Sequence, residues 1–373
     1  MDVEGSDEAV LKDVRKTLQL PRDQRDRNRL ALCTVVLSGR TAKSIDRLTA
    51  AVSEIVEEFT RRLFRMHGLS PPTEMEIKAA NPADDLAPAI SVETVFDMQP
   101  LISDLRMKLL IATVGNQFIT SDHPTVITNQ RFQGRADFPS TSGLAMKGIQ
   151  LFLPLSPSAC LMLYDPSCYR VGGGRAETVV IDRQGDMDGL NALQILNADS
   201  VVYFRCERYA ASVLALRGKF MQRRRQVTKE ATQKFRTQKG GTLFMLNKDD
   251  IPMPAQWSFC KTIRRAPTNF APRDSEVVGL YRKWGDEQKT KRETECRSRS
   301  GFNSEASEGS TLGFLQSTGH WSVTSAVGAT IPRASRVTVC RAANLPWVDN
   351  FYGDVLGAGL FQLLARLCTW LPL

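Results

Sequence analysis

Two apolar stretches of the chain each end at a polar residue beside a proline, and this pair constrains the fold more than any other feature. Residues 118–124 read Phe-Ile-Thr-Ser-Asp-His-Pro, and residues 148–157 read Gly-Ile-Gln-Leu-Phe-Leu-Pro-Leu-Ser-Pro. Proline has no backbone N–H to donate to a sheet, so it marks a strand end or a sheet edge. The two stretches therefore predict two neighbouring strand ends.

The surrounding pattern predicts an α+β fold. Apolar residues recur at steps of three and four over residues 44–64, which predicts a helix with Ser44 as its N-cap. A weaker helical pattern starts at residue 91 and is interrupted by Pro100. Extended patterns follow at residues 109–114, 118–120, 125–128, 149–153, 160–164, 178–181 and 201–204, with a short helix over residues 186–196.

Gly115 and Asn116 stand between the first two of these strands and predict a tight hairpin turn. A chain in which helices come first and closely spaced strands follow is typical of an α+β domain. We therefore expect an N-terminal helical layer beside a mainly antiparallel sheet, with a basic and partly disordered C-terminal extension.

The positive charge of the chain is concentrated in one segment, which sets the predicted domain limits. The 373 residues carry a net charge of +9; residues 217–300 hold 21 Lys and Arg against 9 Asp and Glu, and the remainder holds 28 against 31. This change places a boundary near residue 220. We expect a polar N-terminal segment (1–40), an α+β domain (41–216), a basic extension (217–285), a disordered segment (286–342) and an apolar C-terminal segment (343–373).

Cysteine usage and the chain ends indicate the compartment. The eight cysteines include no Cys-x-x-Cys pair, and Met1 is not followed by a signal peptide, so we expect reduced thiols and an intracellular, cytoplasmic or nuclear protein. Residues 355–373 are apolar and just long enough to cross a bilayer. Arg366 and Pro372 make a core or interfacial helix the preferred interpretation over a membrane anchor.

Ser121, Asp122 and His123 gather three groups able to do chemistry at one strand end. An aspartate beside a histidine could act as general acid and base in a hydrolase, for example on nucleic acid or another phosphate ester. Adjacent strand residues point to opposite faces, so Asp122 and His123 share a pocket only if the strand ends between them. Such an enzyme would also need a partner near Asp122, for which the chain offers Ser156, Asn191 and Asp186.

The structural alternative is that these polar groups terminate the strand. Ser121 or Asp122 would then cap the turn that Pro124 enforces, with a side-chain oxygen accepting an amide hydrogen two residues on. Ser156 lacks the Gly-x-Ser-x-Gly surroundings of a catalytic nucleophile, which also favours a structural role for the second motif.

Metal and cofactor sites find no support in the sequence. His67, His123 and His320 lie far apart, and none has a second ligand at helical spacing. The stretch that starts at Gln184 resembles a calcium loop, but Ile195 stands where such a loop needs glutamate. We predict no metal and no cofactor.

The basic segment 217–265 offers a possible contact with nucleic acid. Its Lys and Arg side chains could neutralise phosphates, and Phe220 and Phe235 could stack on bases. The alternatives are a solvated linker or helix, or a nuclear-localisation signal, because no known nucleic-acid-binding motif surrounds the segment. The candidate contacts are Arg223, Arg224, Arg225, Lys229, Lys234 and Arg236.

The two proline-bordered motifs resemble those of an uncharacterised family of bacterial and fungal proteins, a domain of unknown function with Ser-Asp-x-Pro and Pro-Leu-Ser-Pro motifs. The resemblance covers residues 40–215, although the His-Tyr-Val-Pro-like segment that opens family members is absent before Arg40. It carries over the motif positions Ser121, Asp122, Pro124, Pro154, Leu155, Ser156, Pro157 and Asn191. Because the family has no assigned activity, the resemblance implies a binding or structural module of unknown function.

Overall fold

The structure is a computed structural model of the whole chain. It describes residues 3–70, 72–74, 76, 81, 83–113, 115, 117–132, 143–223, 232–236, 242–246, 251, 256–263, 272–274, 276, 278–279, 311–317, 320–325 and 338–339. The chain forms two compact units, which are described separately. The first unit comprises residues 1–44, 95–227 and 248–278, and the second comprises residues 45–94, 228–247 and 279–373.

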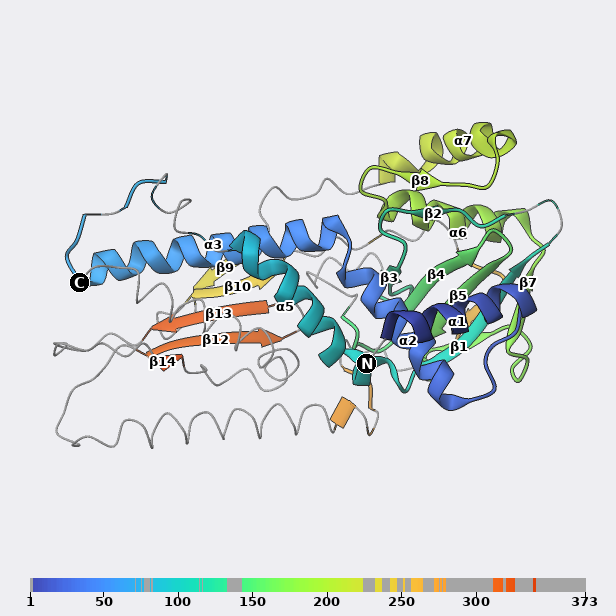
Figure 1. Ribbon diagram of the computed structural model, residues 1–373, viewed down its shortest axis with the longest axis horizontal. Coiled ribbons are helices and arrows are strands. Elements are labelled where there is room, and N and C mark those ends of the chain that lie inside the picture. Colours follow the sequence, from blue (N-terminus) through green and yellow to red (C-terminus); the bar gives the residue numbers. More distant parts are fainter. Residues whose placement is uncertain are drawn as a thin grey trace. The chain divides into compact units, whose positions relative to one another are not determined.

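A five-stranded mixed sheet of order β3-β4-β5-β1-β7 forms the centre of the first unit (Figure 1). Its strands are β1 (Arg106–Ala112), β3 (Val126–Thr128), β4 (Gln150–Ser156), β5 (Ala159–Tyr164) and β7 (Thr178–Ile181). All neighbours are antiparallel except β1 and β7, which run parallel with Leu109 opposite Thr178. The predicted α+β fold with a mainly antiparallel sheet is confirmed.

Helices cover both faces of this sheet. On one face, α1 (Val3–Thr17) and α2 (Gln24–Gly39) bury a stripe of apolar side chains against strand residues. Val10, Val14 and Leu30 share this core with Leu109 and Leu161. The segment 1–40 is polar in composition, yet its few apolar residues recur at helical steps, so it supplies part of the N-terminal helical layer.

The opposite face is covered by α6 (Gln184–Asn197), on which α7 (Ala210–Phe220) packs in turn. Leu190 and Leu193 of α6 share a core cluster with Leu110, Phe152 and Met162 of the sheet. The predicted helix over residues 186–196 is therefore confirmed. Its apolar face is what positions its polar residues beside the first motif.

Two short strand pairs complete the first unit. One joins β2 (Thr120–Ser121) to β8 (Val202–Tyr203), and the other joins β6 (Tyr169–Val171) to β11 (Cys260–Thr262), both antiparallel. Short 3-10 helices lie at Gln99–Ile102 (η1), Glu207–Tyr209 (η2) and Met221–Arg223 (η3).

The predicted hairpin between residues 109 and 120 is wrong. β1 lies between β5 and β7, and β2 pairs with β8 instead of β1. A glycine beside an asparagine permits a tight turn but does not force one. Here β1 finds apolar neighbours on both edges, so the chain leaves the central sheet after Ala112.

The second motif does not end its strand at the first proline. β4 continues through Pro154 to Ser156, with a register shift against β5 between these two residues. β3 pairs only with residues 150–152 of β4, so beyond Phe152 the strand has a single neighbour. A bulge at a position paired on one side accommodates a residue that has no N–H.

Part of the predicted basic extension folds with the first unit. Ile251, Trp257 and Cys260 join the core on the α6 face, and the Trp257 ring meets the Phe152 ring edge-on at a centroid distance of 4.9 Å. The family motifs and this late segment therefore share one core, although about a hundred residues separate them in sequence.

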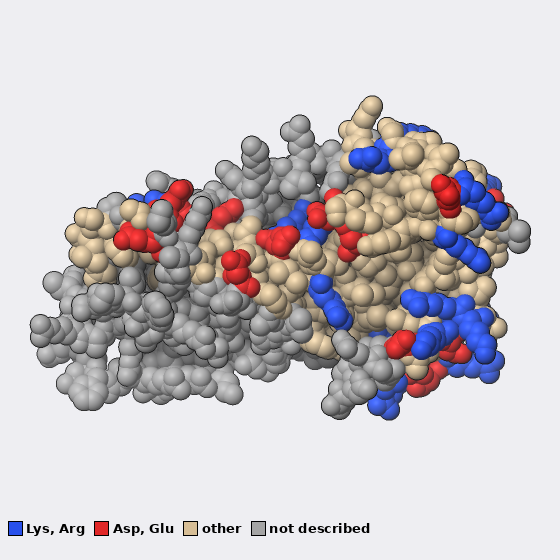
Figure 2. Space-filling model, turned by 45° about the horizontal axis from the view of Figure 1, so that its top comes forward, with Lys and Arg blue, Asp and Glu red and all other residues tan. Residues whose placement is uncertain are grey.

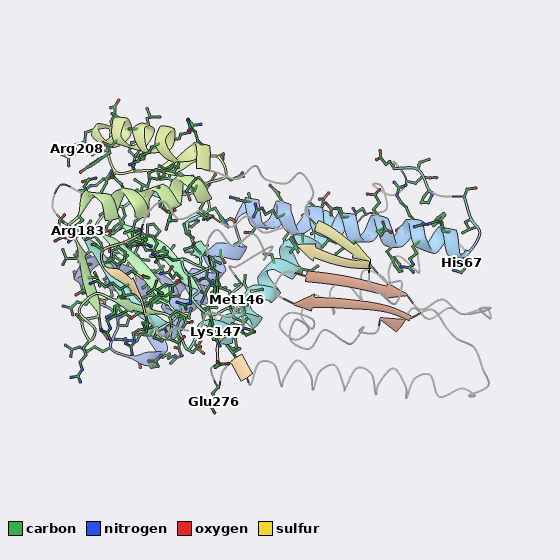
Figure 3. The ribbon with its side chains drawn as sticks, turned by 180° about the vertical axis from the view of Figure 1, so that it is seen from behind. His67, Met146, Lys147, Arg183, Arg208 and Glu276 are labelled. Carbon is green, nitrogen blue, oxygen red and sulfur yellow. The ribbon has the colours of Figure 1, made fainter. Side chains whose placement is uncertain are left out.

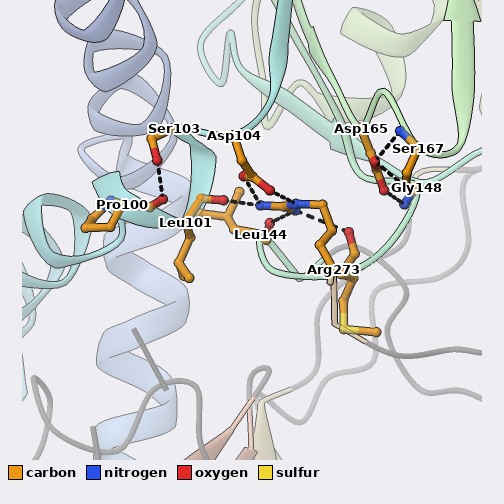
Figure 4. A network of polar contacts seen from close by, with 10 residues as sticks. Pro100, Leu101, Ser103, Asp104, Leu144, Gly148, Asp165, Ser167 and Arg273 are labelled. Atoms are coloured by element: carbon orange, nitrogen blue, oxygen red, sulfur yellow. Dashed lines mark hydrogen bonds and ion pairs between the residues drawn. The ribbon is translucent and has the colours of Figure 1, made fainter. Parts of the chain in front are cut away.

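The buried Arg273 holds three separate segments of this unit together (Figure 4). Its guanidinium donates to both carboxylate oxygens of Asp104 at 2.9 Å. It also donates to the backbone carbonyls of Leu101, Leu144 and Met146. The short segment around Arg273 is therefore an integral part of the first unit.

In the second unit, the predicted helix over residues 44–64 is confirmed as most of α3 (Ala42–Met66), which buries Val52, Ile55 and Phe59. Its cap is Thr41 and not Ser44, because the helix begins at Ala42 and the Ser44 N–H donates to Thr41 Oγ1 at 3.3 Å. The weaker helix expected from residue 91 is α5 (Ala83–Asp97), which starts earlier and contains Pro88.

A second five-stranded sheet of order β14-β12-β13-β10-β9 belongs to this unit. Its strands are β9 (Thr232–Arg236), β10 (Thr242–Leu246), β12 (Thr311–Ser317), β13 (His320–Ser325) and β14 (Thr338–Val339). The last three strands lie within residues 286–342, the segment expected to be disordered; its other residues, and the apolar segment 343–373, lie outside the described ranges.

Within the described ranges, no helix combines the length and the apolar character that crossing a bilayer requires. Residues 355–373, the segment considered as an anchor, are not among them.

Candidate functional site

The first motif lies on an extended segment, residues 117–125, that runs through β2 beside α6. The Phe118 N–H donates to the Pro157 carbonyl at 2.8 Å, so this segment begins beside the end of the second motif. On its other edge, Ser121 stands opposite Val202 of β8. The start of the first motif and the end of the second motif are therefore neighbours at their backbone.

Three carboxamide side chains of α6, Asn191, Gln194 and Asn197, hold this segment, and we call them the carboxamide ladder. They recur every third residue and so lie along one side of the helix, with exposed fractions of 8%, 2% and 5%. Asn191 accepts a hydrogen bond from the Ile119 N–H at 3.1 Å and donates to the Gln117 carbonyl at 2.9 Å. It thereby replaces a neighbouring strand on this edge.

The next two rungs continue the same contacts along the segment. Gln194 donates to the Pro124 carbonyl at 2.8 Å, and its own oxygen lies 3.1 Å from the Ser121 hydroxyl. That hydroxyl also lies 3.0 Å from the His123 carbonyl, a second acceptor for its proton. Asn197 donates to the His123 carbonyl at 2.5 Å. The His123 and Pro124 carbonyls of the motif are thus paired inside the fold.

His123 itself turns toward the start of α3. Its Nδ1 lies 2.6 Å from Thr41 Oγ1, the hydroxyl that caps this helix. The following Thr125 hydroxyl donates to the Thr34 carbonyl of α2 at 2.8 Å. The end of the motif therefore fastens to the connection between α2 and α3.

Asp122 faces the other way, toward the connection between α6 and β8. Its carboxylate accepts hydrogen bonds from the backbone N–H groups of Asp199, Ser200 and Val201 at 2.9, 2.8 and 2.9 Å, and from the Ser200 hydroxyl at 2.8 Å. Partial burial acts to raise the pKa of Asp122, but these hydrogen bonds outweigh it and lower the pKa to about 2.

Asp122 therefore caps a turn, but not the local one that the sequence suggested. The amides it binds lie 77 to 79 residues further along the chain. Its own N–H donates to the Val201 carbonyl at 3.1 Å. A capping role from an aspartate beside a proline was predictable, whereas the identity of the capped turn depends on the path of the chain.

The residues that a hydrolase would need are engaged elsewhere. Asn191 is a rung of the ladder, and Asp186 accepts hydrogen bonds from the Ser258 N–H and hydroxyl. Among the described residues, the Ser156 hydroxyl bonds with the hydroxyl and the N–H of Ser158. None of these three side chains forms a hydrogen bond with Asp122, and Asp122 and His123 contact different elements.

The second motif forms the turn between β4 and β5. Leu155 is buried in the core shared with α1 and α2, and Pro157 occupies the turn itself. The Ser156 hydroxyl accepts the Ser158 N–H at 3.2 Å, which is a local cap of the kind that serine often supplies.

The structure describes only some residues of the other candidate sites. Arg223 ends η3, and Lys234 and Arg236 lie in β9, whereas Arg224, Arg225 and Lys229 fall outside the described residues. Contact of residues 217–265 with nucleic acid stays a prediction. Among the residues that the structure describes, no three His, Cys, Asp or Glu side chains are grouped so that they could hold a metal ion.

Two rungs of the ladder, Gln194 and Asn197, were not predicted from the sequence. A signal was present, since carboxamides at residues 191, 194 and 197 interrupt an otherwise apolar stretch at a spacing of three. Side chains of this kind in a buried helix need partners with both donors and acceptors, and an extended backbone offers both.

Comparison with known proteins places the chain in a family. A family model described as "Protein of unknown function (DUF4238)" matches residues 2–208. No curated protein and no solved structure matched the chain. The matched residues include α1 and α2 as well as the first motif and α6, so the match starts well before residue 40, where the resemblance began. Since the match covers more than half of its length, the chain belongs to the DUF4238 family of proteins of unknown function.

Proposed function

We propose that the first unit is a binding or structural module in which the Ser-Asp-His-Pro segment is a structural strand. The observation that carries this proposal is the state of Asp122, whose carboxylate receives three successive backbone amides and a hydroxyl. A general base works best when its pKa lies near the operating pH. A carboxylate with a pKa of about 2, with its oxygens already hydrogen-bonded, is poorly suited to accept a proton at neutral pH.

The arrangement of His123 supports the same conclusion. The histidine bonds to the helix-capping Thr41, whereas Asp122 binds the turn before β8. Acid and base partners in catalysis must meet within hydrogen-bond reach or through one water. A role in fastening β2 to the start of α3 and to the turn before β8 accounts for both side chains.

The test compares stability and hydrolysis in variants of the motif. Asp122→Ala should lower the melting temperature, and wild type, Asp122→Asn and His123→Asn should share the same background turnover of a nitrophenyl phosphodiester, RNA and single-stranded DNA. Ser156→Ala is the matched control, because the partner of its side chain among the described residues lies in its own turn. A variant that melts like wild type but loses a measurable turnover would contradict the proposal and favour the hydrolase.

We further infer that the protein works in the cytoplasm or the nucleus. Support comes from Cys160, Cys168, Cys206 and Cys260, which are free thiols in the structure. Burial raises the pKa of Cys168 to about 11 and that of Cys260 to about 12. Imaging of the full chain with a fluorescent tag checks this inference; secretion into the medium would contradict it.

A further inference from the structure

The strand β8 has one paired edge and one edge without a neighbour in the described part of the chain. It pairs with β2 alone, with Thr120 opposite Tyr203 and Ser121 opposite Val202. The Asp122 N–H donates to the Val201 carbonyl, so residues 122 and 201 form a hydrogen-bonded pair. Hydrogen-bonded and non-hydrogen-bonded pairs alternate along an antiparallel ladder, so the N–H and carbonyl of Val202 point away from β2.

The Ile119 contacts confirm this alternation from the other strand. Ile119 would stand opposite Phe204, and its N–H points away from β8 to Asn191 of the ladder. Phe204, like Val202, then directs its backbone groups outward. Unpaired strand edges of this kind are templates for an incoming strand, and proteins usually cover or blunt them.

Exposed apolar side chains lie on this strand and on the helix that follows it in the chain. Val201, Tyr203 and Phe204 expose 42%, 54% and 37% of their surface, and Leu214 of α7 exposes 62%. Few other large apolar residues among those described are as exposed. Apolar surface that is concentrated on one short strand and its flanking helix marks a contact site for another molecule.

The strand and the helix that follows it carry a net positive charge. Residues 201–223 contain five basic residues and one acidic residue, Glu207, whereas Asp199 and the hydrogen-bonded Asp122 lie beside the start of the strand. Arg205, Arg208, Arg217 and Lys219 are all exposed, and Arg208 lies over the Tyr209 ring at 5.0 Å from its centroid. Figure 3 shows Arg208 at the end of the first unit that carries α7. Figure 2 is turned so that this side comes forward, and it shows charged side chains in small groups on a mostly uncharged surface.

We propose that β8 is a docking edge for an extended, acidic peptide segment of a partner protein, which adds as a strand beside Val202. The outward N–H and carbonyl supply main-chain hydrogen bonds, the exposed apolar residues contact alternate side chains, and the arginines pair with carboxylates. A second copy of this chain fits less well, because two β8 edges would bring the same basic residues together. A lipid or nucleic acid would leave the outward backbone groups of Val202 without the regular partners that a strand provides.

This inference deepens the proposed binding function and rests on it. The carboxamide ladder fixes one edge of β2, and Asp122 fixes the turn before β8, so the docking edge is held rigid before any partner arrives. Rigid presentation lowers the conformational cost of binding. The contacts of Asp122 that stabilise the turn before β8 therefore also hold the exposed edge of β8 in place.

The experiment uses the full chain and a display library of short random peptides, followed by titration of the most enriched peptide by fluorescence anisotropy. Selected peptides should be rich in Asp and Glu that alternate with apolar residues. Their affinity should fall as salt rises from about 0.05 to about 0.3 M. Arg205→Glu with Arg208→Glu should weaken binding at least tenfold. The control of equal charge change is Arg170→Glu with Lys261→Glu on the exposed positions of β6 and β11, which should bind like wild type.

Val202→Pro tests the backbone contribution, because it removes the outward N–H while the hydrogen-bonded pair of Asp122 and Val201 remains. It should abolish binding with a preserved melting transition, and the charge-reversal pair keeps the test decisive if this variant does not fold. Enriched peptides without acidic bias, or equal binding by the charge-reversal variant, overturn the proposal. So does tighter binding to oligo-thymidine or to phosphatidylserine vesicles, or self-association of the full chain in sedimentation. If no peptide binds and no hydrolysis is detected, only the proposal of a docking edge is contradicted. If hydrolysis is detected and depends on Asp122, the proposed structural role of the motif is contradicted as well.

Discussion

Single residues in turns and loops explain how the first unit holds its irregular segments in place. Asp122 and Arg273 bind backbone groups that no sheet or helix pairs, and Gly148 allows a turn in which its N–H donates to Asp165. A lost partner at such a point leaves a buried donor or acceptor unpaired, which costs more than the hydrogen bond itself contributes. Residues of this kind should therefore show large and specific effects on substitution.

Asp122→Ala should lower the free energy of unfolding by about 1 to 2 kcal/mol at pH 7, the range for loss of a charged capping oxygen. The folded pKa of about 2 lies below the unfolded value of about 3.9. Its stabilisation is therefore complete above pH 4 and disappears as the pH falls toward 2. Urea unfolding of both proteins at pH 7, 4 and 3 measures this. A difference that stays constant down to pH 3 would disprove the assigned cause.

Gly148→Ala should destabilise the protein by more than about 1 kcal/mol, because Gly148 has a φ of +78° that disfavours a side chain. A Cβ there would also lie 2.8 Å from Asn129 Oδ1 and 3.2 Å from the Tyr169 hydroxyl. Gly173→Ala is the matched control, since a Cβ at that position would have no other atom within 4 Å. Thermal melting compares the two; equal melting temperatures would count against strain at Gly148.

At the scale of elements, α6 acts as a substitute strand. Its apolar side packs on the sheet, and its carboxamide ladder satisfies one edge of residues 117–125 while β8 satisfies the other. The first motif is therefore held between a helix and a two-stranded pair instead of joining the central sheet. This placement explains why polar residues at 191, 194 and 197 are tolerated in a buried helix.

Gln194→Ala should lower the free energy of unfolding by about 1 to 3 kcal/mol, because the Pro124 carbonyl would lose its partner in a buried position. Gln184→Ala, at the exposed start of the same helix, should change it by less than about 0.5 kcal/mol. Guanidinium unfolding followed by circular dichroism gives both values. Similar effects of the two substitutions would mean that the ladder does not hold the motif.

At the scale of the whole molecule, the first unit is assembled from segments that are distant in sequence. Residues 251–274 contribute Trp257 and Cys260 to the core and Arg273 to the polar network, beyond the end of the family match at residue 208. The boundary expected near residue 220 followed a change in composition, and composition records charge and not core membership. Trp257, Cys260 and Arg273 of the basic extension are therefore part of the folded first unit.

Arg273→Met should destabilise the first unit by about 3 to 5 kcal/mol, because it leaves the largely buried Asp104 carboxylate and the Leu101 and Leu144 carbonyls without the guanidinium donor. Lys261→Met, at an exposed position of β11, is the control and should melt like wild type. Differential scanning calorimetry of the full chain compares the unfolding transitions of the two variants with that of wild type. Equal transitions would show that the segment around Arg273 does not contribute to the cooperative unit.

The sequence alone determined the α+β class, the helix over residues 44–64 and most strands of the central sheet. These features depend on the periodicity of apolar residues, which acts over a few residues. Only the tertiary structure decided that β1 pairs with β5 and β7, that Asp122 caps a turn 77 residues away, and that α6 holds the first motif. These contacts depend on which distant backbone groups the burial of apolar faces brings together, and a local pattern carries no record of that choice.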